Sequence, residues 1–194
     1  MRIAEIAQRV VWHASYTKGI KQFRFLTHLG TWTAAAERAL GKEFYPTATD
    51  LFYLPVYMYQ VDMSGCRQGI QIQDDSNATE PLDHITDNWE RLPQAVRAKL
   101  NHSARPSTLK KRLPDAFAEL GIDYLWYYNR VESPGSKSFV VLNPSCFVIT
   151  GVEKVTPAYL IRGDPSIVTN LVRRNQWPSN YKTLITQLLK SQKS

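Results

Sequence analysis

The stretch NRVESPGSKSFVVLNP, residues Asn129 to Pro144, poses the question on which the fold and the function of this chain depend. A strand runs into the carboxylate of Glu132, then into a Pro-Gly-Ser turn, and then into a second strand that ends in Asn-Pro. One interpretation is a surface hairpin with a charge near its tip. The other is a glutamate held at the lip of a cleft, because strand and turn constrain the backbone on both sides of Glu132.

The segments around this hairpin predict an α+β fold. Three closely spaced strands are predicted in IDYLWYYN, SKSFVVLN and SCFVIT, and VEKVTPAYLI is a candidate fourth. Earlier in the chain, strands are predicted in VVWHAS at residues 10–15 and in LFYLPVYMYQVDM at residues 51–63, with Pro55 placing the latter at an edge or bulge. We therefore expect a mixed, mostly antiparallel sheet with helices between the early strands.

Helices are predicted where caps, alanines or helical spacing occur. TWTAAAERALGKE has a threonine cap and an alanine run, with Glu37 and Arg38 expected to point outward. Further helices are predicted in LDHITDNWERL and PQAVRAKLNH, and a connector in HSARPSTLKKRLPDAF. PDAFAELG is a short predicted helix that begins at Pro114. We expect a loop in GCRQGIQIQDDSNATEP.

The composition sets bounds on the class of protein. The chain has 194 residues, of which 43% are hydrophobic, so it can bury the core of one domain or of one domain with an appendage. Its apolar runs are strand-sized and its start has no apolar leader, so neither a membrane span nor a secretory signal is expected. Two cysteines without metal-ligand spacing fit a reducing cytosol, and Cys146 is expected in the core. We expect a cytoplasmic protein, in its own cell or delivered into a target cell, and predict no metal site.

The positive charge is concentrated in the C-terminal tail. The formal net charge is +7, and after residue 161 six basic residues face a single acid, Asp164. DPSIVTNLVRRN and SNYKTLITQLLKSQ predict two short amphipathic helices. We divide the chain into a domain at residues 1–161 and a basic helical extension at residues 162–194. This extension either packs on the same domain as a solvated helix face or meets an acidic protein or a nucleic acid.

Few polar residues are candidates for chemistry. His13 follows an apolar run, which is typical of a structural histidine in a buried strand. His28 precedes a Leu-Gly-Thr turn, which is either an ordinary helix entry or a helix N-terminus that receives an anion or an amide. His84 and His102 are predicted at the surface, in or beside polar helices. The chain has no glycine-rich phosphate loop, no G-x-S-x-G and no H-E-x-x-H, which excludes the enzyme classes that those motifs define.

Taken in order, VVWHAS, HLGTWTAAAERA and LGIDYLWYYNRVESPGSKSFVVLNP resemble the ADP-ribosyltransferase superfamily, in particular its phage-associated and bacterial toxin-like members. Those members carry a Tyr-His-Gly-Thr first strand, a His-Phe-Gly-Thr second element and a final segment Gly-Tyr-Asp-Gly-Ile-x-Tyr-x-Asn-x-x-Glu-x-x-Gly-Ser-x-Ser-Tyr. The resemblance covers residues 10–150, and its last segment is the most specific part. It implies a split, mostly antiparallel sheet around an NAD cleft, with C-terminal helices outside the resemblance.

The resemblance implies a mono-ADP-ribosyltransferase, a toxin, effector or anti-defence protein that cleaves the nicotinamide–ribose bond of NAD. It would transfer ADP-ribose to a macromolecular acceptor, a protein or a nucleic acid. The ribose becomes cationic as that bond breaks, and a carboxylate beside it stabilises the developing charge. The resemblance gives that role to Glu132. It implies NAD-binding roles for His13 on a ribose hydroxyl, for the backbone of Ala14 on the nicotinamide amide, and for His28, Gly30, Thr31 and Ser136 around the pocket and the glutamate turn.

Other roles stay open within the resemblance. An aromatic ring would stack on the nicotinamide, with Tyr16, Phe23, Phe25 and Tyr53 as candidates. Asn129 would fix the end of its strand or contact the target, and Arg130 beside it is the other predicted target-binding residue.

The chain also departs from the family pattern. Arginine-specific members carry Glu or Gln two residues before the catalytic glutamate, and Arg130 in that place argues against an arginine acceptor. The second element has no tyrosine. One alternative is therefore a catalytically inactive binding module for an acidic protein or nucleic acid. An unrelated nucleic-acid enzyme or structural protein is another, suggested by the charge and the aromatic residues, although core packing explains those aromatics.

Overall fold

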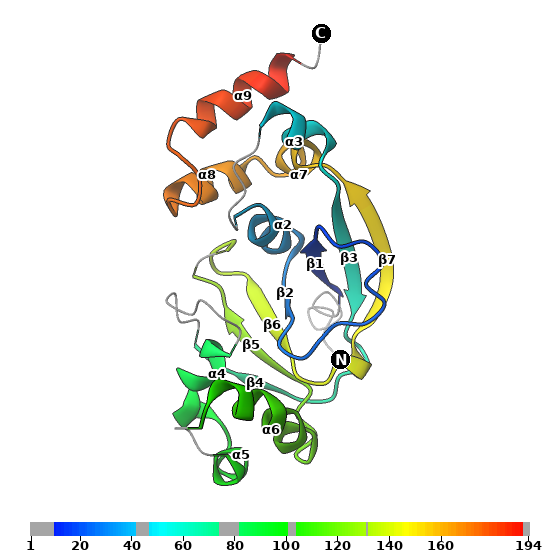
Figure 1. Ribbon diagram of the computed structural model, residues 1–194, viewed down its shortest axis with the longest axis vertical. Coiled ribbons are helices and arrows are strands. Elements are labelled where there is room, and N and C mark those ends of the chain that lie inside the picture. Colours follow the sequence, from blue (N-terminus) through cyan, green and yellow to red (C-terminus); the bar gives the residue numbers. More distant parts are fainter. Residues whose placement is uncertain (1–9, 42–46, 74–81, 101–103, 131, 192–194) are drawn as a thin grey trace.

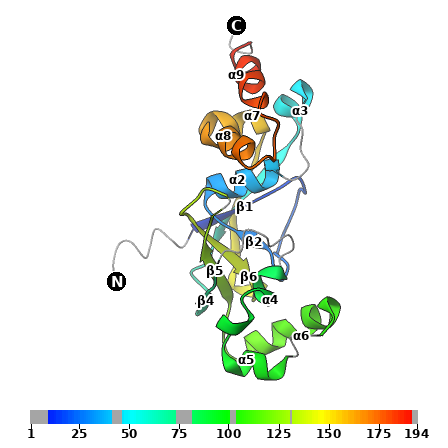
Figure 2. The ribbon, with the colours of Figure 1, turned by 90° about the vertical axis from the view of Figure 1, so that its left-hand side faces the viewer.

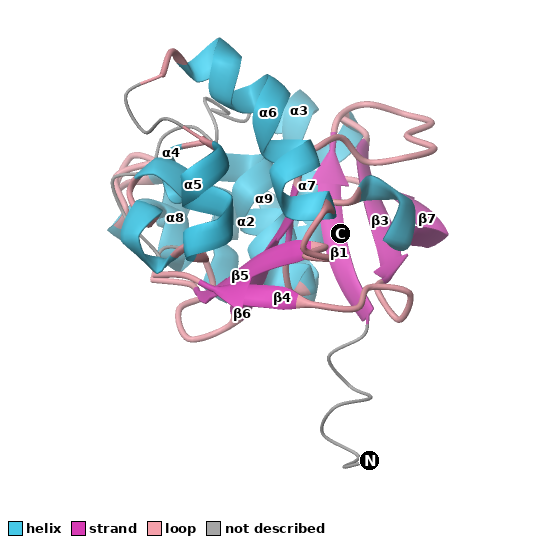
Figure 3. Ribbon diagram, turned by 90° about the horizontal axis from the view of Figure 1, so that it is seen from below, coloured by secondary structure: helices cyan, strands magenta, loops and turns pink. Residues whose placement is uncertain are grey.

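Two β-sheets form the centre of the structure, a computed structural model that describes residues 10–41, 47–73, 82–100, 104–130 and 132–191. Its strands are β1 (Val10–Ser15), β2 (His28–Leu29), β3 (Val56–Asp62), β4 (Gly69–Gln71), β5 (Tyr124–Tyr128), β6 (Lys137–Val141) and β7 (Val148–Val155). One sheet has the antiparallel order β1-β3-β7. The other has the order β2-β6-β5-β4, in which β4 runs parallel to β5. The sheets lie side by side when seen from below (Figure 3).

The two sheets meet where β1 passes the end of β2. Trp12 and Gly30 exchange both main-chain hydrogen bonds there, with N···O distances of 2.8 and 3.0 Å. The next pair in this antiparallel register would be Ala14 and His28, and no main-chain hydrogen bond joins them. The sheets therefore separate directly beyond the bridge.

A helical layer packs on the first sheet, at one end of the molecule (Figures 1 and 2). In it, the alanine-rich helix α2 brings its buried side chains, including Ala36 and Leu40, against Ile167, Leu171 and Trp177 of the C-terminal segment. This layer consists of α2 (Trp32–Gly41), α3 (Ala48–Tyr53), α7 (Pro157–Gly163), α8 (Ser166–Arg173) and α9 (Tyr181–Ser191). The C-terminal helices thus share a core with α2 and the first sheet.

A second group of helices lies at the opposite end, beside β4 and β5 (Figures 1 and 2). It consists of α4 (Asp83–Thr86), the 3-10 helix η1 (Trp89–Arg91), α5 (Gln94–Lys99) and α6 (Pro106–Ala118). Leu113 and Phe117 of α6 pack with Leu125 and Val140 of the second sheet in one buried cluster.

Several predicted elements are corrected. Residues 51–63 are not one strand, because a capping box between Thr47 and Asp50 starts α3, and β3 begins only at Val56. The predicted connector before Pro114 is mostly α6, which continues through Pro114. Burial of Leu113 and Phe117 on either side compensates for the hydrogen bond that proline cannot donate.

Two further corrections concern a short strand inside a predicted loop and a predicted strand that divides into two elements. The predicted loop after Cys66 contains β4, which pairs with β5. The candidate fourth strand divides, because its first half continues β7 and its second half is α7. The helix at α2, the hairpin strands β5 and β6, and the tail helices α8 and α9 are present as predicted. The coarse expectation of an α+β fold with antiparallel and mixed sheets is confirmed.

The two cysteines are not free. Cys66, after β3, and Cys146, in the 3-10 helix η2 (Pro144–Cys146), form a disulfide with their Cα atoms 5.0 Å apart. Cys146 is buried, as predicted, but the pairing removes the argument from cysteine usage for a reducing compartment. Among the helices that the structure describes, none combines the length and the apolar character required to cross a membrane.

Candidate functional site

A narrow hollow lies where the two sheets separate, and α2 closes one side of it. We call it the junction hollow. It is lined by Trp12, His13, Ala14, His28, Leu29, Gly30, Ala34, Ala35, Arg38 and Ser138. It therefore brings together four predicted NAD-binding residues from two separate sequence motifs, namely His13, Ala14, His28 and Gly30.

Small residues allow this junction to close. A Cβ on Gly30 would lie 3.1 Å from Ser138 Oγ and 3.2 Å from Ala34 Cβ, which is tighter than ordinary contact. The helix α2 begins at Trp32, and Thr31 before it caps the helix by accepting a hydrogen bond from the N–H of Ala34 at 3.2 Å. Glycine and alanine at these positions therefore let α2 lie against the junction.

His13 points one ring nitrogen at the neighbouring strand. Its Nδ1 lies 3.0 Å from the carbonyl oxygen of His28, and a carbonyl can only accept a hydrogen bond, so Nδ1 carries the proton. Burial is the main cause that lowers the pKa of His13, and the charge of Arg38 lowers it further, against the opposing effect of the His28 carbonyl. The ring is then neutral near pH 7, and Nε2 is left as a hydrogen-bond acceptor.

The peptide groups of Ala14 face the opening between the sheets. Trp12 directs its N–H and C=O toward Gly30, and main-chain groups alternate sides along a strand, so those of Ala14 also point away from β3. Because the sheets separate at this position, Ala14 makes no main-chain hydrogen bond with His28. The separation thus exposes a donor and an acceptor, side by side, to the junction hollow.

His28 belongs to a buried cluster of aromatic rings. Its Nδ1 lies 3.1 Å from the hydroxyl of Tyr127 on β5, and that hydroxyl also accepts a 3.5 Å hydrogen bond from Arg38. His84 stacks on Tyr127 with ring centroids 4.9 Å apart and is buried, so its prediction as a surface residue is wrong. The sequence around His84 is polar and therefore gave no sign that α4 packs inward. His102 lies outside the described residues.

Glu132 reaches this cluster through Arg38. Arg38 Nη2 forms an ion pair with Glu132 Oε2 at 2.9 Å, and the Glu132 side chain is only 15% exposed. The interpretation of Glu132 as a solvent-exposed charge at a hairpin tip is therefore wrong. Its carboxylate lies one side chain away from the junction hollow, because Arg38 also lines that hollow.

Asn129 fixes the hairpin that carries Glu132. Its N–H donates to the carbonyl oxygen of Ser136 at 2.8 Å, and its Nδ2 donates to the hydroxyls of Ser136 and Ser138 at 2.9 and 2.8 Å. Asn129 is buried, so of its two predicted roles the structure favours bracing of the strand end. Ser136 belongs to the same brace through its hydroxyl and carbonyl oxygens, whereas Arg130 is exposed on the hairpin.

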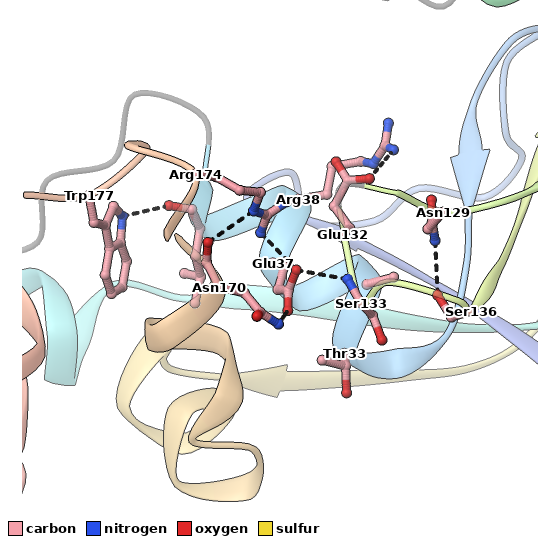
Figure 4. A network of polar contacts seen from close by, with 12 residues as sticks. Thr33, Glu37, Arg38, Asn129, Glu132, Ser133, Ser136, Asn170, Arg174 and Trp177 are labelled. Atoms are coloured by element: carbon pink, nitrogen blue, oxygen red, sulfur yellow. Dashed lines mark hydrogen bonds and ion pairs between the residues drawn. The ribbon is translucent and has the colours of Figure 1, made fainter. Parts of the chain in front are cut away.

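Arg38 and Glu37 were both expected to point outward, but Arg38 lines the junction hollow and pairs with Glu132, and Glu37 departs furthest from that prediction. It is fully buried, not outward-facing, and its carboxylate accepts hydrogen bonds from three donors. These are the N–H of Ser133 at 3.0 Å, Asn170 Nδ2 at 2.7 Å and Arg174 Nη2 at 2.7 Å (Figure 4). Burial raises the pKa of Glu37, and these three partners oppose that rise.

Other predicted residues lie apart from the junction hollow. Tyr53 ends α3, is 73% exposed, and lines a separate depression with Glu153 and Tyr159, so the structure does not bring this predicted cofactor-binding residue to the junction hollow. The reason is that α3 replaces the predicted strand there. Thr31 is exposed at the helix cap and does not line the hollow.

The remaining aromatic candidates separate as well. Phe23 packs edge-on against His13, with ring centroids 5.2 Å apart. Tyr16 donates its hydroxyl to the carbonyl oxygen of Ala39 at 3.1 Å, and Phe25 packs on the cluster around α6. Of the four candidates, Phe23 is therefore the one in contact with His13.

A wider depression adjoins the junction hollow, on the other side of His13. We call it the loop depression. It is formed by the loop between β1 and β2 and is lined by His13, Thr17, Lys18, Gly19, Ile20, Gln22, Phe23, Arg24 and Thr27. Its side chains include two cations and no acid, so it favours an anionic group next to His13.

The chain was compared with protein families, with curated proteins and with solved structures. No protein-family model matches the chain, and searches of curated proteins and of solved structures find no match.

Proposed function

We propose that the chain is a mono-ADP-ribosyltransferase that cleaves the nicotinamide–ribose bond of NAD and transfers ADP-ribose to a macromolecular acceptor. One observation carries the proposal. Three segments far apart in sequence, with His13, His28 to Gly30, and Glu132, converge on the junction hollow through Arg38. The same three segments carry the resemblance to the ADP-ribosyltransferase superfamily.

Different groups of the site match different parts of the NAD molecule. The open N–H and C=O of Ala14 match the C=O and NH₂ of a carboxamide, as on nicotinamide. The free Nε2 of His13 can accept a hydrogen bond from a ribose hydroxyl. Lys18 and Arg24 in the loop depression are cations of the kind that pair with a pyrophosphate.

Glu132 would supply the electrostatic part of the reaction. As the bond to nicotinamide breaks, the ribose gains positive charge, and an ionised carboxylate held beside it lowers the barrier. Arg38 orients this carboxylate before substrate arrives, because the two side chains form an ion pair at 2.9 Å. A ribose hydroxyl entering the hollow would share or replace this contact with Arg38.

The acceptor is proposed as a macromolecule, a protein or a nucleic acid. Arg130 is exposed two residues before Glu132, so an acceptor at the hairpin would meet its positive charge. A toxin, effector or anti-defence role is the part of the proposal that rests on the resemblance alone.

The test is incubation with labelled NAD and a bacterial lysate, followed by separation of protein and nucleic-acid fractions. Glu132→Gln keeps the shape of the side chain and removes its charge, and we expect transfer to fall by roughly 10²–10³-fold. Glu153→Gln, at a distant glutamate, serves as the matched control. Full transfer by Glu132→Gln would overturn the assignment, and the labelled fraction would identify the acceptor class.

A second candidate function is a catalytically inactive binding module, favoured by the C-terminal helices. A groove between α7, α8 and α9 has Arg162, Lys182 and Lys190 around a floor that includes Val168 and Leu189. This helix groove has no acid and no aromatic ring in its lining, which suits an acidic, partly apolar protein segment better than stacked bases.

The same assay discriminates between the two functions. No NAD turnover and no NAD binding by calorimetry, together with binding of an acidic peptide that Lys182→Glu abolishes, would favour the binding module. Point variants are preferable to deletion of the tail, because Ile167, Leu171 and Trp177 belong to the buried core.

A further inference from the structure

Two consecutive residues of α2 hold the turn between β5 and β6 that carries Glu132, which we call the Glu132 hairpin. Arg38 contacts the carboxylate of Glu132, and Glu37 accepts the N–H of the next residue, Ser133. Ser133 has a φ of +42°, which is uncommon for a residue other than glycine and persists where surrounding contacts impose it. The position of the carboxylate therefore depends on where α2 presents Glu37 and Arg38.

Glu37 is in turn held by α8. Asn170 Nδ2 donates to one of its carboxylate oxygens, and Arg174 Nη2 donates to the other, the same oxygen that accepts from Ser133. Arg174 is itself 12% exposed and its Nε donates to the carbonyl oxygen of Asn170 at 3.1 Å. Figure 4 shows this chain of contacts running from α8 through Glu37 to the hairpin.

Stability alone does not account for a buried ion pair of this kind. Removing two charges from water costs about as much as their attraction returns, and apolar replacements of similar size are often neutral or stabilising. What the pair does provide is a carboxylate with fixed orientation, since Asn170 of α8 binds one of its oxygens and Arg174, at the end of that helix, binds the other. A fixed carboxylate fixes the N–H of Ser133.

We propose that Glu37, oriented by Asn170 of α8 and by Arg174 directly after that helix, is the positioning residue of the Glu132 hairpin. The C-terminal helix α8, which lies outside the segments that resemble the transferase superfamily, is thereby a working part of the site. The expected effect of Glu37 on NAD turnover rests on the proposed function. The claim that Glu37 and its partners hold the hairpin in place does not depend on that function.

The decisive variant replaces both charges with apolar side chains, Glu37→Met with Arg174→Met. Loss of the hydrogen bond to Ser133 should raise amide hydrogen exchange in residues 129–136 about tenfold. Hydrolysis of NAD should lose about tenfold in kcat with KM changed less than about twofold, because Glu37 does not line the junction hollow. The unfolding temperature should be retained.

Two further variants complete the test. Glu37→Gln keeps an acceptor for Ser133 and should restore most of the protection and of kcat. Arg173→Met makes the same change at the exposed neighbour on α8 and should behave as wild type. Should the double variant fail to fold, Asn170→Ala, which removes one hold on Glu37 and keeps the ion pair, is measured in its place.

The two arms separate the two proposals. Wild-type exchange in the hairpin of the double variant, or of its Asn170→Ala substitute, would overturn the positioning role. An equal loss of protection across the whole chain would overturn it too, because the effect would then be general destabilisation. Absence of NAD turnover in the wild type would instead contradict the proposed function, and the exchange arm would still decide the inference.

Discussion

His13 illustrates how one side chain can serve packing and recognition together. Its Nδ1 binds the His28 carbonyl across the gap between the sheets, so it replaces a main-chain hydrogen bond that the separated strands lack. Its ring packs against Phe23, and its second nitrogen is an acceptor at the boundary of the junction hollow and the loop depression. The acceptor role requires the neutral ring, because both nitrogens of a protonated imidazole are donors.

This requirement predicts a pH dependence. Folding lowers the pKa of His13 below its usual 6.5, mainly through burial, so below about pH 6.5 the unfolded chain binds a proton that the folded chain does not. Stability should therefore fall on acidification, by no more than about 1.4 kcal/mol per pH unit for this group. Urea unfolding at intervals of roughly half a pH unit, between about pH 7.5 and about pH 5, measures this loss of unfolding free energy on both sides of the usual histidine pKa.

The control is His13→Asn, which keeps a donor for the His28 carbonyl and does not titrate. The difference in unfolding free energy between wild type and His13→Asn should shrink toward low pH. A difference that is constant with pH would show that His13 does not titrate as inferred.

Residues were predictable from sequence where a local pattern marks them. His13, His28 and Gly30 stand in short motifs, and Glu132 stands between a strand and a turn. Glu37 could not be placed, because an alanine-rich helix has small side chains on every face and its donors come from positions 133, 170 and 174. Tyr127 was hidden among the aromatic residues of a strand, where each ring suggests only core packing.

At the scale of elements, the β5–β6 hairpin depends on one buried side chain. Asn129 spans the hairpin with bonds to both Ser136 and Ser138, and Gly135 donates its N–H to the Asn129 carbonyl at 2.9 Å. Gly135 has a φ of +85°, which favours glycine and allows the turn to close. The loop between them holds Glu132 and Ser133 against α2.

Asn129→Ala should therefore act as a structural change rather than a loss of acceptor contact. We expect a loss of about 1–3 kcal/mol in unfolding free energy, because the two serine hydroxyls lose a buried donor. Labelled transfer to any acceptor should fall in parallel with NAD hydrolysis without acceptor. If Asn129 instead bound the target, transfer would fall while hydrolysis and stability stayed at wild-type values, so comparing the three measurements decides its role.

Elements were predictable where one signal dominates. The capped alanine helix α2 and the β-branched and aromatic strands β5 and β6 occur as expected. The signals conflict at residues 51–53, where aromatic residues favour a strand but the Thr47–Asp50 capping box starts a helix. They conflict again at Pro114, where proline suggested a helix start and tertiary packing kept it inside α6.

At the scale of the whole molecule, the two sheets have separate cores on their outer sides and a third cluster between them. That central cluster includes Tyr59 and Phe147 and lies beside the bridge between Trp12 and Gly30. The disulfide between Cys66 and Cys146 belongs to the same region. It joins the segment after β3 of the first sheet to the segment after β6 of the second, so it ties the sheets covalently where main-chain pairing is sparse.

This arrangement makes the stability of the molecule depend on the redox state. The disulfide closes a loop with a sequence separation of 80 residues, and its reduction should lower the unfolding free energy by about 4 kcal/mol through the entropy of the unfolded chain. Guanidinium unfolding with and without reductant measures the difference. Cys66→Ser, which cannot form the bond, should match the reduced wild type and should not respond to reductant. Coincident curves for oxidised and reduced wild type would show that the bond contributes nothing to holding the sheets together, and the junction hollow would then depend on packing alone.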